Sequence, residues 1–206
     1  MSAPRERPIL FSGPMVRAIL DGCKTQTRRV MKPQPKKNRY PTERESGHFV
    51  TTSYYSTCDE GLECPYGGRR DRLWVRETFC PMGPSRPSGY WTDPKWKGRE
   101  CFYAADNDRP LWAGKWKPSI FMPRALSRIT LAVADVRVQR VRDITEEDAL
   151  AEGTQAVPIA SIKRQAALSE RGDFAGIWDA INGKRPGCAW ADNPWVWAIT
   201  FSRVIS

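Results

Sequence analysis

Apolar residues recur at helical or strand spacing in a few separate stretches of the chain, and these stretches predict its core elements. Over residues 12–20, apolar side chains repeat every four positions behind a serine that can cap a helix, and Gly22 is the expected stop. Residues 72–77 alternate instead, which predicts a strand with Leu73, Val75 and Glu77 on one face. The first half of the chain therefore predicts a short helix and a strand that carries an acidic residue on its apolar side.

The second half of the chain predicts two strands and two helices. Residues 128–141 have the best strand pattern, but their apolar phase slips, which predicts a bulge or bend near Asp135. Thr145 and the acidic residues after it resemble a capping box and predict a short helix that ends at Gly153. Residues 169–182 predict a longer helix, and the chain from 195 onward alternates as a closing strand. The helix has an apolar stripe of Phe174, Ile177, Trp178 and Ile181, and the strand directs Trp195, Trp197, Ile199 and Phe201 to one side.

Two long stretches, at about 33–70 and 81–118, show little periodicity and are rich in glycine, proline and polar residues, as loops or insertions are. The second stretch holds Trp91, Trp96, Trp112 and Trp116, so we expect it to cover the core or to form the wall of a pocket. With 206 residues, 40% of them hydrophobic, the chain can bury a sizeable core. We expect one domain over 1–206 with insertions at these two stretches.

The composition narrows the class of protein and the kind of partner. No stretch reaches the roughly 18 apolar residues of a membrane span, and the N-terminus lacks a signal-peptide core, so we expect a cytoplasmic protein with no membrane partner. The six cysteines form no CxxC pair, and we expect neither a metal nor a cofactor. The net charge of +10 is uneven, since residues 24–44 hold eight basic residues against one acidic residue. Such a segment attracts phosphates, or it is a solvated loop whose charge serves solubility.

The run from Gly22 to Arg29, GCKTQTRR, is the strongest candidate for chemistry. In an extended segment Lys24 and Thr27 point to opposite sides, whereas in a turn they can converge. A threonine hydroxyl becomes a nucleophile when a base takes its proton, and a lysine is such a base only if burial or nearby cations lower its pKa. The alternative is a solvated turn in which the threonines bond to the backbone.

The same run resembles the GxKTxTxR signature of the ASCH domain family, part of the PUA-like superfamily. Residues 71–79 (DRLWVRETF) resemble the family's strand of pattern LxVxE, and residues 144–153 (ITEEDALAEG) resemble its acidic helix. Most of the chain is similar to a prophage-encoded group of ASCH-like proteins. The resemblance implies an α+β fold, a small mixed PUA-like β-barrel flanked by short helices, here with long irregular insertions.

Members of this family include small bacterial amidohydrolases that remove the acyl group from N(4)-acetylcytidine with a lysine, a threonine and a glutamate. By motif position these residues are Lys24, Thr27 and Glu152, so the resemblance implies an amidohydrolase of N(4)-acylated cytosine nucleosides or nucleotides. In the implied mechanism Lys24 is the base toward Thr27, whose hydroxyl attacks the acyl carbonyl, and Glu152 orients the substrate or relays a proton to the leaving amine. Without the resemblance, Glu152 is interpreted as a solvated residue at the end of an acidic helix.

Five further residues are candidate substrate contacts. Thr25, Arg28 and Arg29 belong to the motif, and Arg29 could stabilise a developing oxyanion. Glu77 either contacts the substrate or is a buried partner for an arginine such as Arg29. Arg124 either meets a phosphate or lies in solvent between two loops.

Because the chain is much larger than a minimal ASCH domain, the two insertions could cover or reshape a pocket. An RNA- or DNA-binding module without catalysis, in which Lys24, Arg28, Arg29 and the basic loop contact phosphates, is therefore a rival to the hydrolase. A ribonuclease is a third alternative. In either case tryptophans of the 91–116 stretch could stack on bases.

Overall fold

A five-stranded sheet forms the centre of the computed structural model, which describes residues 4–35, 39–43, 49–53, 56–82, 100–108, 110, 112–156 and 169–205. Its strand order is β1-β6-β9-β10-β2. β1 runs parallel to β6, and the other neighbours are antiparallel. The strands span Glu6–Leu10 (β1), Gln26–Val30 (β2), Arg72–Arg76 (β6), Thr130–Arg140 (β9) and Trp195–Arg203 (β10). The edge strand β2 thus carries the second part of the GCKTQTRR motif.

Apolar side chains cover both faces of this sheet. The larger core contains α1 together with Trp197 and Ile199, whereas the smaller core contains α2, α3 and Val196. Because adjacent residues of a strand point to opposite faces, these positions of β10 place the two cores on opposite sides of the sheet. The helices span Gly13–Leu20 (α1), Glu146–Ala151 (α2) and Glu170–Asn182 (α3). β2 therefore lies between α1 on one side and α2 with α3 on the other.

Capping and register agree with the sequence predictions. Gly22 follows α1 with a φ of 78°, Thr145 accepts a hydrogen bond from the Asp148 N–H at the start of α2, and Ser169 does the same for Gly172 in α3. The register of β9 against β10 shifts after Thr200, which leaves an extra residue beside Asp135. The predicted bulge is thereby confirmed.

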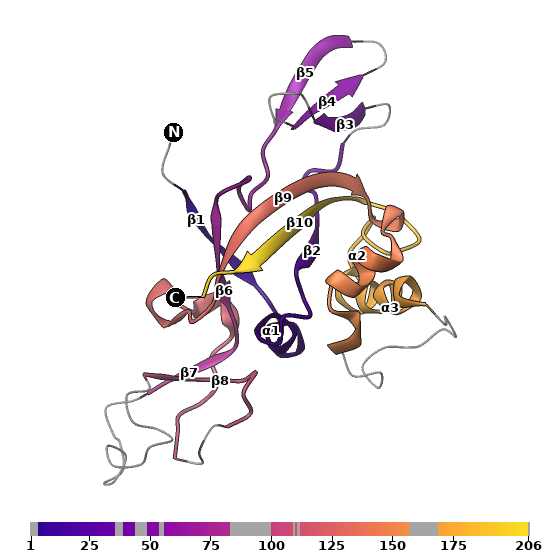
Figure 1. Ribbon diagram of the computed structural model, residues 1–206. Coiled ribbons are helices and arrows are strands. Elements are labelled where there is room, and N and C mark those ends of the chain that lie inside the picture. The colour runs from indigo at the N-terminus through magenta and orange to yellow at the C-terminus, as the bar shows by residue number, and fades with distance from the viewer. Residues whose placement is uncertain are drawn as a thin grey trace.

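Additional strands project from both ends of the central sheet (Figure 1). A three-stranded sheet lies at one end and a two-stranded hairpin at the other. The first comprises β3 (Arg39–Glu43), β4 (Phe49–Ser53) and β5 (Ser56–Leu62), and the second β7 (Phe79–Pro81) and β8 (Cys101–Tyr103). The prediction that 33–70 is irregular is wrong for these strands, because their sequences lack the clean alternation of a strand with one buried face. Parts of both predicted insertions, with Trp91 and Trp96, lie outside the described residues.

The fold is a small mixed α+β domain, and its described strands form an open sheet rather than a closed barrel. A barrel would require a backbone ladder between the edge strands β1 and β2. Arg29 joins them through its side chain instead, because its Nη2 donates to the main-chain oxygen of Leu10 at 2.6 Å. The predicted stripe of α3 also needs one correction, since Ile181 is 59% exposed beyond the end of the smaller core.

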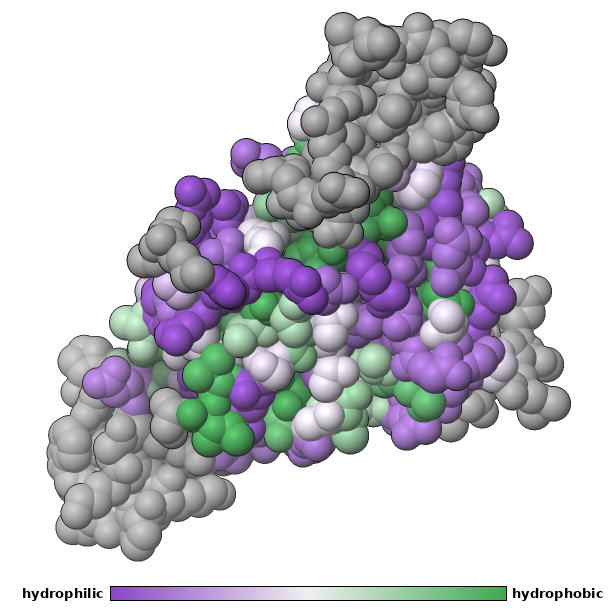
Figure 2. Space-filling view, turned by 45° about the horizontal axis from the view of Figure 1, so that its top comes forward, coloured by the Kyte–Doolittle hydropathy of each residue, from purple (hydrophilic) through white to green (hydrophobic). Residues whose placement is uncertain are grey.

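On the face seen in Figure 2, hydrophilic residues predominate among the coloured atoms, and hydrophobic residues gather in separate small areas. Among the described helices, none has both the length and the apolar character that crossing a membrane requires.

Candidate functional site

Lys24 is buried at the junction of α1 and β2, with 3% of its surface exposed. Its backbone N–H donates to the Ala18 oxygen, which places the side chain directly behind α1. The ammonium donates three hydrogen bonds, to the main-chain oxygens of Gln26 (2.7 Å) and Glu152 (2.7 Å) and to Glu152 Oε2 (2.8 Å). All three of its protons are therefore engaged, and the solvated-turn interpretation of Lys24 is wrong.

Glu152 reaches Lys24 because the C-terminal end of α2 packs against Lys24. Glu152 is the C-terminal cap of α2, and only 6% of its surface is exposed. Gly153 follows with a φ of 77°, and a Cβ at this position would lie 3.1 Å from the Cβ of Lys24 and 3.2 Å from that of Ala18. A residue without a side chain is thus required both by the backbone conformation and by the close approach of the two segments. The interpretation of Glu152 as a solvated helix-end residue is also wrong.

Arg28 extends this ion pair into a network. Its Nη1 donates to Glu152 Oε1 (3.1 Å) and to Gln26 Oε1 (2.7 Å), and its Nη2 forms an ion pair with Asp148. Arg137 in turn donates to both carboxylate oxygens of Asp148 at 3.2 Å. Acidic and basic groups thus alternate along the network, so that each buried charge has an opposite partner.

Burial and ion pairing shift the protonation of this network. Burial lowers the pKa of Lys24, although the charge of Glu152 opposes this shift. At Asp148 burial raises the pKa. The hydrogen bond from Gln26 and the charges of Arg28 and Arg137 outweigh this effect and keep the pKa of Asp148 below its ordinary value. Lys24 is consequently the group of the network that releases its proton more readily than the same side chain in water.

Thr27 and Arg29 face the opposite side of β2, toward the larger core. Thr27 pairs with Ile199 and Arg29 with Trp197, and both partners belong to that core. Thr27 is 4% exposed, and its hydroxyl makes no hydrogen bond with the described part of the chain. Phe11 lies close to two cations, with its ring centre 5.7 Å from Lys24 Nζ and 5.1 Å from Arg29 Cζ. The structure therefore joins Lys24 to Glu152 directly and places Thr27 on the Phe11 side of the same strand.

The remaining predicted contacts lie in other environments. Thr25 is exposed, and its backbone donates to the Ala151 oxygen and accepts from the Phe201 N–H, so it holds α2 and β10 together. Arg124 is exposed and forms an ion pair with Glu6 at 2.9 Å. It therefore lies at the surface, as the alternative interpretation expected.

Glu77 is buried away from the motif, and its partner is not Arg29. It is 2% exposed and accepts from Arg128 Nε (2.9 Å) and Nη2 (3.1 Å). Arg128 also donates to both oxygens of Asp106 at 2.8 Å and stacks on the ring of Tyr103 at 4.0 Å. The expectation of an arginine partner was correct, but Arg128 rather than Arg29 provides it.

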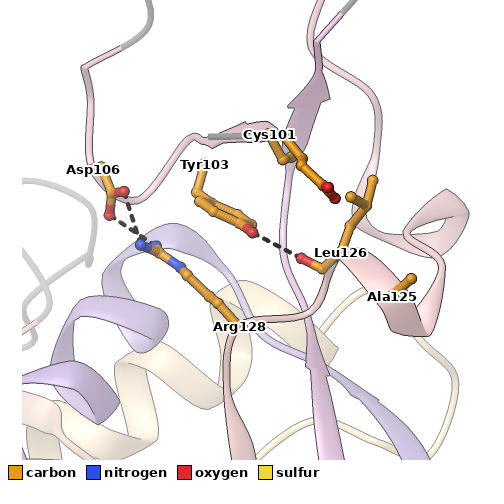
Figure 3. Close-up of a pocket in the computed structure, with 7 residues that line it drawn as sticks. Cys101, Tyr103, Asp106, Ala125, Leu126 and Arg128 are labelled. Atoms are coloured by element: carbon orange, nitrogen blue, oxygen red, sulfur yellow. Dashed lines mark hydrogen bonds and ion pairs between the residues drawn. The ribbon is translucent and has the colours of Figure 1, made fainter. Parts of the chain in front are cut away.

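A pocket of about 410 Å³ opens beside this second cluster (Figure 3). Arg128, Asp106 and Tyr103 line it, and Arg128 points to Asp106 while the Tyr103 hydroxyl donates to the Leu126 oxygen at 2.9 Å. Lys24, Thr27 and Glu152 are not among its lining residues. The pocket and the motif network are thus separate features of the fold.

Sequence reasoning missed Asp148, Gln26 and Arg137 as members of the network. Asp148 lies one helical turn before Glu152, and Gln26 lies two positions from Arg28 on an extended strand, so periodicity places each beside a residue already singled out. Arg137 carried no such signal, because its position depends on the register of β9 against β10.

Comparison with known proteins leaves the family open. No family model matches the chain, and no curated protein does. Among solved structures, a crystal structure of a protein from Enterococcus faecalis V583, described as a DUF984 protein, is similar with a TM-score of 0.40 and 9% sequence identity. The match covers 99% of this chain and 82% of that one, and a likeness at this level carries no argument about function.

Proposed function

We propose that this chain is an ASCH-like amidohydrolase that removes the acyl group from N(4)-acylated cytosine nucleosides or nucleotides. The observation that carries the proposal is the buried Lys24–Glu152 pair at 2.8 Å next to strand β2, whose Thr27 hydroxyl makes no hydrogen bond with the described part of the chain. These are the three residues that the ASCH resemblance implies. On this proposal the open sheet, joined at its edges by Arg29, is a variant of the PUA-like barrel.

The pair gives Lys24 a route to its base form. On this proposal Lys24 passes a proton to Glu152 Oε2, which lies 2.8 Å from Nζ, and burial, which lowers the pKa of Lys24, favours the loss of that proton. The neutral amine then takes the proton of the Thr27 hydroxyl as the oxygen attacks the acyl carbonyl. The C–N bond breaks, the cytosine amine receives the proton held by Glu152, and water hydrolyses the acyl-threonine ester.

The same geometry favours a hydrolase over a binder that uses Lys24 and Arg28 as phosphate contacts. Both cations are buried and neutralised by Glu152 and Asp148. A phosphate at either cation would have to displace a buried carboxylate, which leaves that carboxylate without its partner. The alternative of a nucleic-acid-binding module therefore loses Lys24 and Arg28 as phosphate contacts.

A chromatographic assay of N(4)-acylated cytosines, cytidines and deoxycytidines tests the proposal. Thr27→Val keeps the shape of the side chain and removes the hydroxyl, whereas Thr27→Ser keeps the hydroxyl. We expect release of the free base or nucleoside by wild type and by Thr27→Ser, and a loss of at least about a thousandfold in Thr27→Val and in Lys24→Ala.

Ser202→Ala is the matched control, because Ser202 carries an exposed hydroxyl on the neighbouring strand β10. Full activity in Thr27→Val would refute the nucleophile, and activity in both Thr27→Val and Lys24→Ala would refute the site. If wild type releases no product from any substrate while it cleaves RNA, the ribonuclease alternative replaces the amidohydrolase.

A further inference from the structure

Arg29 is a cation that has no carboxylate partner among the residues that the structure describes. It is half-buried, and within the described part of the chain its side chain makes one hydrogen bond, from Nη2 to the main-chain oxygen of Leu10. Its Nε is buried without a partner. A guanidinium has five N–H donors, and leaving a buried one unpaired is unfavourable. The side chain is thus held in place with unused capacity to donate.

Two aromatic rings lie beside this guanidinium. The Arg29 Cζ lies 5.1 Å from the ring centre of Phe11 and 5.9 Å from that of Tyr66. Such contacts hold the planar group without using its N–H donors, which lie at its edge. Within the part of the chain that the structure describes, the ring contacts therefore leave the N–H donors other than the one bonded to Leu10 without a partner of their own.

A second arginine contacts the same segment of the chain. Arg7 of β1 is half-buried, donates from Nη1 to the Pro65 oxygen at 3.2 Å, and also has a buried Nε without a partner. Pro65 precedes Tyr66, so Arg7 and Arg29 contact neighbouring residues of the same segment. No carboxylate forms an ion pair with either arginine in the described part of the chain.

Arg29 and Arg7 differ from the buried or half-buried cations of the two carboxylate clusters. Arg28 and Arg128 are each paired with two carboxylates, and Lys24 is paired with one. Lys24, Arg28 and Arg128 are thus neutralised, whereas Arg29 and Arg7 keep capacity for an anion from outside. Arg76 is half-buried and also has an Nε without a partner among the described residues, but its guanidinium packs on the ring of Trp74 at 4.7 Å. Two parallel N–H groups of an arginine can donate to two oxygens of the same phosphate.

We propose that Arg29, together with Arg7, binds a phosphate group of the substrate. Arg29 and Thr27 lie two positions apart on the same face of β2, which separates their backbones by about 7 Å. The phosphate site is therefore adjacent to the proposed nucleophile. The inference rests on the proposed function for the cytosine part of the ligand, whereas phosphate binding at Arg29 stands independently of it.

Binding of cytidine, cytidine 5′-monophosphate and inorganic phosphate, followed by calorimetry, tests the inference without turnover. We expect wild type to bind the monophosphate about tenfold to a hundredfold more tightly than cytidine, and Arg29→Gln to abolish this preference. Arg29→Lys keeps the charge but loses the paired donors, so it should retain only part of the preference.

Arg69→Gln is the matched control, because Arg69 also donates to a main-chain oxygen, that of Ala134 at 3.1 Å, but is exposed beside Asp135. It should keep the preference of wild type. Thermal unfolding of each variant shows that it is folded before binding is measured. Equal affinity for cytidine and its monophosphate in wild type, or an unchanged preference in a folded Arg29→Gln, would overturn the inference.

The outcomes also separate this inference from the proposed function. Stabilisation of wild type by inorganic phosphate that is lost in Arg29→Gln, without any deacylation, would support the phosphate site and refute the amidohydrolase. Deacylation by a wild-type protein that inorganic phosphate does not stabilise would support the amidohydrolase and refute the phosphate site. An oligoribonucleotide distinguishes the source of the phosphate, because binding to a strand falls more steeply with salt than binding to one mononucleotide phosphate.

Discussion

Replacement of Lys24 by methionine tests the buried network directly. Methionine fills a similar volume, so the loss comes from the three hydrogen bonds and the charge rather than from a cavity. Removing one partner of a buried ion pair costs about 3–5 kcal/mol. Glu152 keeps Arg28 as a partner at 3.1 Å, which places the expected loss near the lower limit of about 3 kcal/mol.

This loss corresponds to roughly a hundredfold change in the folding equilibrium. Urea unfolding followed by tryptophan fluorescence measures it, with Lys184→Met as the control because Lys184 is exposed. The double variant Lys24→Met/Glu152→Gln should recover part of the stability, since it removes the carboxylate that has lost a partner. The reasoning is refuted if Lys24→Met unfolds within about 1 kcal/mol of Lys184→Met, because exposed lysines contribute little.

Three further predictions follow from the same contacts. Gly153→Ala should lower the free energy of unfolding by about 1–3 kcal/mol in the same urea assay, because the backbone has a positive φ and the new Cβ meets Lys24. The free energy of unfolding should fall as the pH drops below about 4. The ionised Asp148 carboxylate stabilises the fold, because its pKa is lower in the folded than in the unfolded protein, and this contribution disappears as the carboxylate is protonated. Urea midpoints measured against pH should show a weaker fall for Asp148→Asn. Arg128→Met should destabilise the protein by about 3 kcal/mol, because it leaves the buried Glu77 carboxylate without its partner. Glu77→Gln should destabilise it by clearly less, since burial raises the pKa of Glu77 and an uncharged side chain is easier to accommodate there. Equal losses for the two variants in thermal or urea unfolding would contradict this prediction.

The three helices and the strands β6, β9 and β10 could be predicted from local patterns because each has a local cause. The edge strands β1 and β2 of the same sheet were not predicted, because neither has a clear alternation of apolar and polar residues. The bulge near Asp135 follows from a slip in the apolar phase, and α2 follows from Thr145 and Gly153 at its two ends. The β3, β4 and β5 strands could not be predicted in this way. Their sequences do not alternate apolar with polar residues as a strand with one buried face does, and the three strands form a sheet of their own, separate from the central one.

The candidate site was predictable as a set of residue types but not as a set of contacts. The motif suggested that Lys24 and Glu152 meet, and the structure joins them across 128 positions of sequence. The partner of Glu77 was assigned to the wrong arginine, because Arg128 and Arg29 are equally basic in the sequence. Only the long-range packing of β6 beside the residues preceding β9 decides between them.

The adjacent arginines of the motif show why a basic run cannot be interpreted as a single patch. Arg28 and Arg29 look alike in the sequence, yet strand alternation sends them to opposite faces of β2. Arg28 meets Asp148 and Glu152 from α2, where the acidic helix neutralises it, whereas Arg29 meets two rings and a carbonyl. One arginine of the pair therefore supports the fold, and the other keeps the capacity to bind an anion. A test of function should accordingly change Arg29, because loss of activity in an Arg28 variant would report a broken network as readily as a lost contact to substrate.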